Sequence, residues 1–523
     1  MSLRSSAGVP ALTVLALVLG GCALPGGGDD GSPDSEASSG DATTEPQRGS
    51  ALSAPTTPPA RICGSKGLAG PATPPAGARR VPTSQRLDDV VAGAPRGATF
   101  WLAPGVHRLS TGEYDQIVPK NGQTFIGAPG AILDGQNANR YAFTGHATQV
   151  TIEHLTIQNF GGPAENNNEG VVNHDAGHDW RVLHNTIRRN AGAGVFVGSG
   201  DVVAHNCLVA NGQYGFSAYE NQGVEGIVLR HNEIAGNNTD DWERRRPGCG
   251  CTGGGKFWET RGARVLDNWI HDNHSVGLWA DTNNTGFLIQ GNYISGNDSG
   301  GIIYETSYNA AIIDNAFVRN GLVEGPRNPG FPTPALYISE SGSDPRAGQT
   351  YGDMFEVAHN RFVDNWAAVM AWENADRFAG SPANTSTDSI TLVTPETATI
   401  ADCSDPDTVK REPWLDDCRW KTQRLRVHDN TFRFDPAHLG ADCTAANGCG
   451  FMGLVSNYGT YPNWSPYKGE VVEDHITFDQ DNRWYSNRYA GPWRFQAHEL
   501  GSTVSWSEWR EAPYNQDESS TLD

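Results

Sequence analysis

Short apolar segments recur between positions 181 and 366, with the length of strands of three to five residues, and an asparagine follows seven of them. Seven segments share one pattern (Asn, any residue, apolar, any two, Asn): VLHNTIRRN, VAHNCLVAN, LRHNEIAGN, VLDNWIHDN, IQGNYISGN, IIDNAFVRN and VAHNRFVDN. The first asparagines are Asn185, Asn206, Asn232, Asn268, Asn292, Asn315 and Asn360, and each is followed five residues later by Asn190, Asn211, Asn237, Asn273, Asn297, Asn320 and Asn365. The steps of 21, 26, 36, 24, 23 and 45 residues indicate a repeat of 21–26 residues with two insertions.

The repeat predicts an all-β fold. Its strands are too short for a meander, and the repeat has no room for the helix of a βαβ unit. A coil that stacks like strands about 4.8 Å apart satisfies both limits, so we expect a single-stranded right-handed parallel β-helix with long loop insertions. The asparagine side chains would satisfy backbone groups at the turns. Residues 84–109 predict a short N-terminal cap helix followed by a strand, and residues 476–495 look like late, degenerate rungs.

These rungs and the cap resemble the right-handed β-helix proteins of the pectate-lyase-like superfamily, from about residue 82 to the end of the chain. Many members of that superfamily act on polysaccharides, so the resemblance implies a carbohydrate-active protein. The GHG and RIK motifs of polygalacturonases and the DPHE motif of alginate epimerases are absent from the sequence.

A carboxylate ends each strand that precedes an asparagine pair, in FSAYE, GKFWE, GLWAD, GIIYE, LYISE and VMAWE. Aligned by these ends, Glu220, Glu259, Asp281, Glu305, Glu340 and Glu373 form one column along the helix. The residues two before each acid, which include Trp279 and Ile303, are apolar and are expected to face the core. The residues one before, which include Tyr219, Trp258, Tyr304 and Trp372, would then face outward, and the strand must bend for the acid to do so as well.

We predict catalytic roles for Glu259, Asp281 and Glu305, and substrate-binding roles for Tyr219, Trp258, Tyr304, Trp372, Lys256 and His274. Carboxyls on adjacent rungs would lie near the ~5–5.5 Å separation of retaining glycosidases, and those two rungs apart near the ~9.5 Å limit of inverting ones. The same acids could instead seat Ca²⁺. For Glu340 and Glu373, pairing with Arg346 or Arg377 is the alternative, and Glu220 could be a turn acid.

The insertion at 237–254 would overhang this edge, with Asp240, Asp241, Trp242 and Arg244 to Arg246 as candidate lid residues and Cys249 and Cys251 at its base. A solvated loop is an equal alternative. Residues 371–386 and 456–469 are rich in Trp, Tyr, Asn and Pro, and they could form a groove wall or self-packed loops.

The first 22 residues predict a secretory signal, and LVLGGC resembles a lipobox in which Cys22 would be lipidated. Residues 23–60 have the composition of a flexible tether, which leaves 61–523 as the β-helix domain, with regular rungs at about 120–375 and loop-rich rungs at 376–523. The eight later cysteines favour disulfides, with Cys403–Cys418 and Cys443–Cys449 as loop clips. We therefore expect a monomer on the extracellular face of the membrane, or a secreted one.

The net charge of −22 disfavours nucleic acid and polyanionic substrates. The sequence thus predicts a glycoside hydrolase acting on an extracellular or cell-wall polysaccharide. A Ca²⁺-dependent polysaccharide lyase, with Lys256 or an Arg as base, and a non-catalytic glycan-binding or adhesive lipoprotein are the two alternatives.

Overall fold

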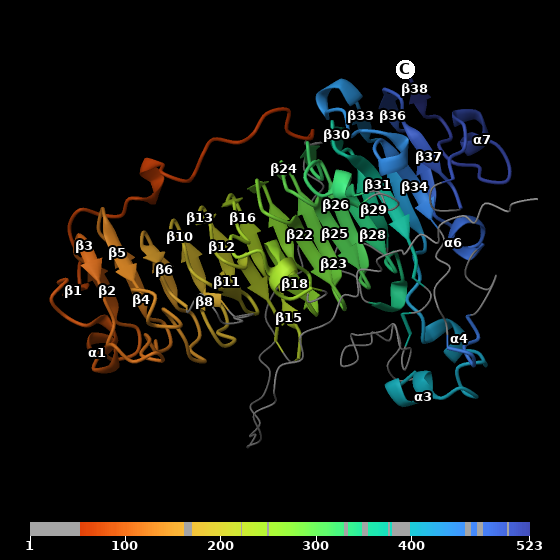
Figure 1. The fold of residues 1–523 in the computed structure, drawn as a ribbon. Helices are drawn as coiled ribbons and strands as arrows, with labels where there is room; N and C mark the ends of the chain where they lie inside the picture. The colour runs from red at the N-terminus through yellow and green to blue at the C-terminus, as the bar shows by residue number, and fades with distance from the viewer. Residues whose placement is uncertain are drawn as a thin grey trace, which may run out of the picture.

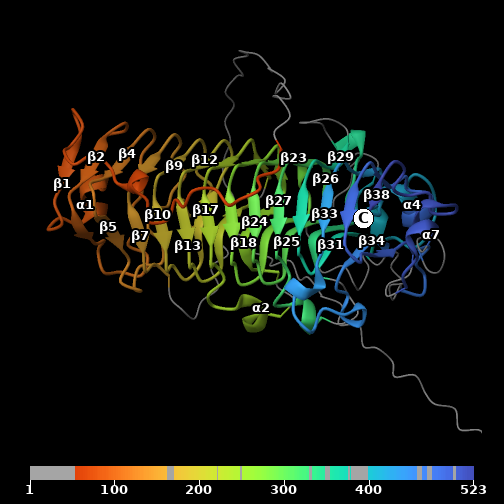
Figure 2. The same cartoon turned by 90° about the horizontal axis from the view of Figure 1, so that it is seen from above.

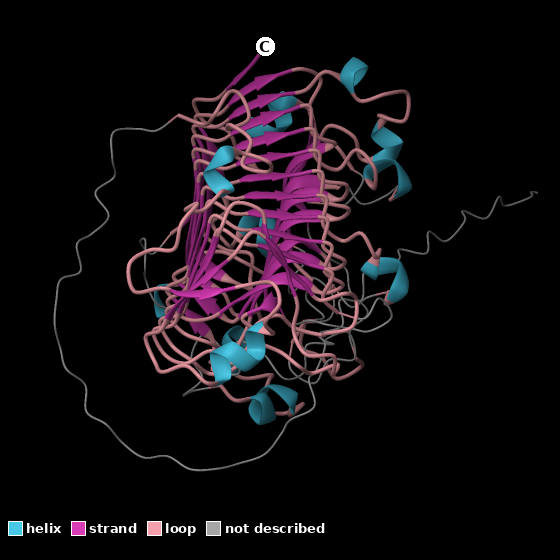
Figure 3. Cartoon of the chain, turned by 90° about the vertical axis from the view of Figure 1, so that its left-hand side faces the viewer, coloured by secondary structure: helices cyan, strands magenta, loops and turns pink. Residues whose placement is uncertain are grey.

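The computed structural model describes residues 53–161, 170–220, 222–247, 250–328, 333–347, 354–374, 377–378, 398–455, 462–467, 474–498 and 502–523. Three long parallel sheets wind around one apolar core. Figures 1 and 3 show the stacked strands from the side and from one end of the coil. The predicted all-β coil is therefore confirmed. It extends from Arg79 to Leu522, beyond the regular range that the sequence indicated.

Sheet A contains β1 (Arg79–Val81), β2 (Thr99–Leu102), β4 (Thr124–Gly127), β6 (Thr151–Glu153), β9 (Arg181–Leu183), β12 (Val202–Ala204), β16 (Val228–Arg230), β20 (Arg264–Leu266), β23 (Thr285–Gln290), β26 (Tyr308–Ile313), β29 (Phe355–Ala358), β32 (Leu425–His428) and β35 (Arg483–Tyr485), with β15 (Val224–Glu225) and β19 (Thr260–Arg261) beside this path.

Sheet B contains β3 (Gly105–His107), β5 (Ala131–Asp134), β7 (Thr156–Gln158), β10 (Thr186–Arg188), β13 (Cys207–Val209), β17 (Glu233–Ala235), β21 (Trp269–His271), β24 (Tyr293–Ser295), β27 (Ala316–Val318), β30 (Arg361–Val363), β33 (Thr431–Arg433), β36 (Arg488–Ala490) and β38 (Thr521–Leu522).

Sheet C contains β8 (Gly170–Val172), β11 (Ala193–Val197), β14 (Tyr214–Ala218), β18 (Gly253–Trp258), β22 (Val276–Asp281), β25 (Gly300–Glu305), β28 (Pro334–Ser339), β31 (Ala367–Trp372), β34 (Phe451–Val455) and β37 (Arg494–Gln496). It carries the acids that the sequence singled out.

Short helices decorate the coil: α1 (Leu87–Ala92), α2 (Trp242–Arg245), α3 (Ile400–Ser404), α4 (Trp414–Asp417), α6 (His475–Phe478) and α7 (Trp506–Arg510). The predicted cap helix is α1, which buries Leu87, Val90 and Val91 at the N-terminal end of the core. Among the described residues, no helix has the length and apolarity needed to cross a membrane.

The asparagines form two hydrogen-bonded ladders, as predicted. Each first asparagine is buried, and its Nδ2 donates to Oδ1 of the next, from Asn185 through Asn292 and Asn315 to Asn360. The structure extends this ladder to Asn430 and Asn487, which the pattern search missed. Because each side chain also binds backbone groups of neighbouring rungs, the ladders fix the register of the coil.

The chain before β1 crosses the outer face of sheet B as an extended strap, residues 53–78 (Figures 1 and 2). Pro58 lies beside Tyr293 of β24, Cys63 is bonded to Cys207 of β13, and Leu68 accepts a hydrogen bond from His154 near the N-terminal end. The strap therefore runs backward along the coil, toward its N-terminal rungs.

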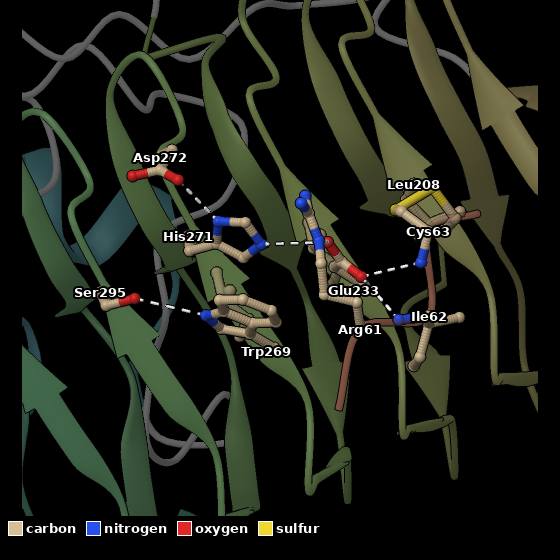
Figure 4. A network of polar contacts seen from close by, with 12 residues as sticks. Arg61, Ile62, Cys63, Leu208, Glu233, Trp269, His271, Asp272 and Ser295 are labelled. Carbon is tan, nitrogen blue, oxygen red and sulfur yellow. Dashed lines mark hydrogen bonds and ion pairs between the residues drawn. A yellow bond between two sulfur atoms is a disulfide. The ribbon is translucent and has the colours of Figure 1, made fainter. Parts of the chain in front are cut away.

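Glu233 of β17 holds the strap in place (Figure 4). One carboxylate oxygen accepts the backbone N–H groups of Ile62 at 2.7 Å and Cys63 at 2.8 Å, and the other accepts from Arg61 at 3.3 Å. His271 of β21 contacts this second oxygen at 3.4 Å and Asp272 at 2.8 Å. His271 and Asp272 thus belong to the contacts that hold the strap on sheet B, although they are close in sequence to the predicted site.

Three disulfides are described. Cys403–Cys418 and Cys443–Cys449 confirm the predicted clips, and Cys63–Cys207 is an unpredicted link across 144 positions. The suggested role of Cys249 at the base of the α2 insertion, the Cys22 lipid anchor and the tether to residue 52 lie outside the described residues, as do most of the 371–386 and 456–469 loops.

Candidate functional site

The pairing of sheet C divides the six acids between two columns. Phe257 of β18 pairs with Ala280 of β22, so Trp258, and not Glu259, lies opposite Asp281. Ala280 pairs in turn with Tyr304 of β25, which places Asp281 beside Glu305. Glu305 pairs with Ser339. The prediction of one continuous acid column is therefore wrong: Asp281 and Glu305 are neighbours on it, and Glu259 lies one position further along its own rung.

The core explains this shift. In every one of these strands the alternate residues face inward, and the inward column at this level is Ala218, Phe257, Ala280, Tyr304, Ile338 and Ala371, all in the main core. Large rings next to the small Ala280 fill the interior, and Tyr304 packs edge-to-face on Phe287 and Phe355. Strict alternation then turns the next residue outward, so Asp281 and Glu305 leave the core without any bend in the strand.

The next outward column is therefore Tyr219, Trp258, Asp281, Glu305, Ser339 and Trp372. The turn column that follows contains Glu220, Glu259, Thr282, Thr306, Glu340 and Glu373. A bend does occur in this second column, where Glu259 and Glu340 have φ of 46° and 45°. The predicted outward role of Tyr304 is wrong, because its side chain lies in the core with 0 % exposure. Trp279, predicted to face the core, faces outward beside Lys256.

Asp281 is held by a lysine on the preceding rung. The Lys256 ammonium lies 2.8 Å from a carboxylate oxygen of Asp281 and donates to the carbonyl of Gly250 at 2.8 Å. The same ammonium lies 4.4 Å from the ring centre of Trp279 and 5.3 Å from that of Trp258. The other Asp281 oxygen accepts the Thr282 hydroxyl at 2.9 Å. A buried cation thus stands beside a nearly buried carboxylate, and the two form an ion pair across adjacent rungs.

Glu305 also has a cation beside it but is more deeply buried than Asp281. Its side chain is 1 % exposed, and one oxygen lies 3.0 Å from the Arg377 guanidinium, whereas the other has no hydrogen-bond partner in the described structure. Burial raises the pKa of the Glu305 carboxyl to about 7 against the opposing effect of Arg377, and the negative charges of Asp281 and Glu340 add to the rise. Near neutral pH this group therefore carries a proton that it can give up.

The outlying acids have structural partners. Glu340 binds Arg377 at 3.1 Å, as one alternative anticipated, and Glu373 pairs with Arg419 and accepts the backbone N–H of Thr422 at 3.0 Å. Arg346 instead pairs with Asp344 and Asp417. Glu220 lies 3.2 Å from His178.

Glu259 faces a different neighbour from the one predicted. It is half-buried, and it accepts a long hydrogen bond of 3.4 Å from Asn283. Burial raises the pKa of its carboxyl, whereas Asn283 and Arg261 lower it. Glu259 is thus on the edge of the candidate site, one position away from the Asp281–Glu305 pair.

Aromatic side chains flank the acid pair on both sides. Tyr219 and Trp258 meet edge-to-face with ring centres 6.0 Å apart, and on the far side Tyr337 and Trp372 lie 6.2 Å apart. Tyr337 was not singled out by the sequence. His274, predicted to bind substrate, lies in the turn before β22, at the opposite end of that strand from Asp281, where it pairs with Asp298 at 3.4 Å. The structure therefore does not bring His274 to the site.

Sequence reasoning also missed Glu243, which lies on α2 in the insertion before β18. Burial raises the pKa of its carboxyl and the nearby Lys256 ammonium lowers it, so this acid lies on the Lys256 side of the pair. The neighbouring Trp242 is buried. The only available signal was the insertion itself, since no repeat marks Glu243.

The positions where calcium was envisaged are occupied by protein cations, Lys256 beside Asp281 and Arg377 between Glu305 and Glu340. Within the described ranges, no three His, Cys, Asp or Glu side chains are arranged to hold a metal ion. Both acids are covered in this structure, with Asp281 7 % exposed, so a substrate reaches them only after the covering side chains move.

Residues 169–378 match the family model described as "Right handed beta helix region". The described sheets form a parallel β-helix, and the match covers its right-handed region at residues 169–378. The predicted parallel β-helix fold is thereby confirmed. A search of curated proteins found no significant match.

Several solved structures are similar to this chain. The periplasmic alginate epimerase AlgG is 10 % identical with a TM-score of 0.41, over 85 % of this chain and 83 % of that one. The A-module of the Azotobacter vinelandii mannuronan C-5 epimerase AlgE4 is 16 % identical with a TM-score of 0.38, over 55 % and 86 %. The GH87 α-1,3-glucanase from Streptomyces thermodiastaticus is 13 % identical with a TM-score of 0.34, over 58 % and 64 %. At these identities the likeness concerns the fold alone.

Proposed function

We propose that this protein is a glycoside hydrolase acting on a polysaccharide, with Glu305 as general acid and Asp281 as nucleophile. One observation carries the proposal: two outward carboxyls on adjacent rungs have different surroundings. The Lys256 ammonium lies 2.8 Å from Asp281, whereas burial raises the pKa of Glu305 to about 7 although Arg377 lies beside it. A pair of carboxyls whose environments differ in this way divides the roles of base and acid.

The spacing supports a retaining reaction. Adjacent rungs lie about 4.8 Å apart, close to the ~5–5.5 Å between the carboxyls of retaining enzymes. Glu305 protonates the glycosidic oxygen while Asp281 attacks the anomeric carbon, so the leaving sugar departs as an alcohol and a glycosyl ester remains. Glu305, now ionised, then takes a proton from water, whose oxygen displaces Asp281. The reaction ends with both groups in their starting states.

The alternatives are less well supported. A lyase needs a free base, whereas the Lys256 ammonium is already engaged by Asp281, Gly250 and two indole rings. A glycan-binding protein without activity would use the flanking aromatic pairs alone, Tyr219 with Trp258 and Tyr337 with Trp372. It would have no use for a proton-bearing carboxyl beside an ionised one.

Asp281→Asn and Glu305→Gln test the proposal on polysaccharides that the parent protein degrades. Each variant should lose at least about 10³-fold in kcat/KM, because each removes a group that acts only in the transition state. Asp267→Asn, on the turn after β20, is the control and should keep the parent rate. Proton NMR of the first product should show the anomeric configuration of the substrate. Inversion, or full activity of both variants, would contradict these roles.

The remaining predictions accompany this proposal. We propose a monomeric polysaccharide-degrading protein, lipidated at Cys22 and held on the extracellular face of the membrane. These proposals are based on the signal-like segment and the lipobox-like LVLGGC ending in the sequence.

A further inference from the structure

More acidic than basic side chains surround Asp281 and Glu305. The two cations at the pair are both committed to acids, Lys256 to Asp281 and Arg377 to Glu305 and Glu340. Glu243 and Glu259 add further carboxyls at the same edge, and neither has an ion-pair partner among the described residues. An incoming cationic sugar would therefore meet two carboxyls that are not engaged in ion pairs.

Glu243 is the better placed of these two acids. One of its carboxylate oxygens is buried and has no hydrogen-bond partner in the described structure. It is near enough to the Lys256 ammonium for that charge to lower its pKa, and the same ammonium contacts Asp281. A buried carboxylate oxygen without a partner is costly unless a ligand donates to it.

A second, independent observation also points to a ligand at this place. Trp279 is only 3 % exposed, and its indole N–H has no acceptor in the described structure. Its ring lies beside the Lys256 ammonium, so the donor belongs to the same cluster. The indole N–H of Trp258 likewise lacks an acceptor. Two unused donors and an unused carboxylate oxygen suit a molecule that carries both hydroxyls and an amine.

We propose that the substrate is a polysaccharide of hexosamines with free amino groups, and that Glu243 binds the ammonium of a sugar next to the cleaved bond. The inference rests on the proposed function, because it assigns the substrate class of the same site. An ammonium donates to the free Glu243 oxygen, the sugar hydroxyls accept from the indole N–H groups, and N-acetylation removes the charge that Glu243 recognises.

The test compares one glycan backbone with and without acetyl groups. Binding of the full-length protein to chitosan and to an α-1,4-linked galactosamine polymer is measured by calorimetry, each against its fully N-acetylated form. The parent should bind the free amine form of at least one backbone about tenfold more tightly, as a charge-assisted hydrogen bond implies. Glu243→Gln should remove most of this preference.

Asp241→Asn is the matched control. Asp241 starts the same helix and pairs with the exposed Arg244, so its loss perturbs α2 and removes a nearby negative charge while the Glu243 carboxyl itself stays in place. It should keep the preference for the amine. If Asp241→Asn and Glu243→Gln lose the preference equally, or if the parent binds amine and acetylated forms alike or binds neither, the inference is overturned.

The two proposals fail separately. Cleavage of a neutral polysaccharide by a parent protein that ignores amino groups would overturn the substrate assignment and leave the hydrolase proposal standing. Tight, Glu243-dependent binding of an amino glycan that is never cleaved would support the recognition site and remove the proposed activity.

Discussion

The Lys256 ammonium lies 2.8 Å from the Asp281 carboxylate across the β18–β22 pairing, and both side chains are more than nine-tenths buried. Phe257 lies between Lys256 and Trp258 on β18 and packs in the core. Because side chains alternate along the strand, Lys256 and Trp258 both face outward, in two neighbouring columns. The pair therefore connects the packing of the coil to the chemistry proposed for its surface.

Replacing Lys256 with Met should abolish this support. The buried Asp281 carboxylate would lose its counter-ion and the contact that fixes its position. We expect kcat/KM to fall about 10²-fold or more, with a loss of stability on the order of 3 kcal/mol. Lys256→Arg, which keeps the charge, is the control and should keep most of both. A Met variant with the kcat/KM and stability of the parent would argue against a role for the ion pair.

The asparagine ladder gives a stability prediction. Asn292 is fully buried; its Nδ2 donates to Val265 at 2.8 Å and to Asn315 at 2.9 Å, and its Oδ1 accepts from the backbone and side chain of Asn268. Asn292→Ala should cost about 3 kcal/mol or more of unfolding free energy, because several buried groups lose their partners together. Ser295→Ala, on the outer face of the same rung, should change it by less than about 1 kcal/mol. Urea denaturation of both variants provides the measurement.

The asparagine ladders could be predicted from the sequence, but the alignment of the acids could not. The ladders were predictable because their spacing is constant and their partners are identical. The sequence prediction aligned the strands by their terminal acids, whereas the strand register is set by the core residues. Ala280 fits between Phe257 and Tyr304, and this fit involves three rungs together. A single residue of slip then exchanged the faces of Trp279 and Tyr304.

Other features carry no local signal at all. Glu243 reaches the site from an insertion, and Arg377 lies 72 positions from Glu305 and 37 from Glu340. The Cys63–Cys207 link and the strap contacts to Glu233 span even longer separations. These contacts depend on how the loops fold back onto the coil, which cannot be predicted from residue spacing or composition.

The contacts of the strap with Glu233 should make the free energy of unfolding depend on pH. Glu233 is buried, which alone would raise the pKa of its carboxyl, but hydrogen bonds from His271 and from the backbone of Cys63 and Ile62 lower it to about 2. A carboxyl whose pKa is lower in the folded state stabilises the fold above pH 4.5, and this contribution is lost as the pH falls toward 2. Glu233→Gln should remove about 2–3 kcal/mol of this dependence. Denaturation curves between pH 2 and 7 would show it, and parallel curves for parent and variant would count against the clamp.

Four histidines stack on consecutive rungs, His154, His184, His205 and His231, with ring centres 5.1, 4.9 and 5.0 Å apart. Burial lowers the pKa of His205, and the charges that His184 and His231 would carry lower it further. Because the folded pKa lies below the unfolded value of about 6.5, this stack favours the fold above that pH and loses the contribution as the pH falls through the folded pKa. An NMR titration should give a His205 midpoint below 6.5, and His184→Asn should move it upward by removing one neighbouring charge. A midpoint that stays fixed in the variant would show that His184 does not lower the pKa of His205.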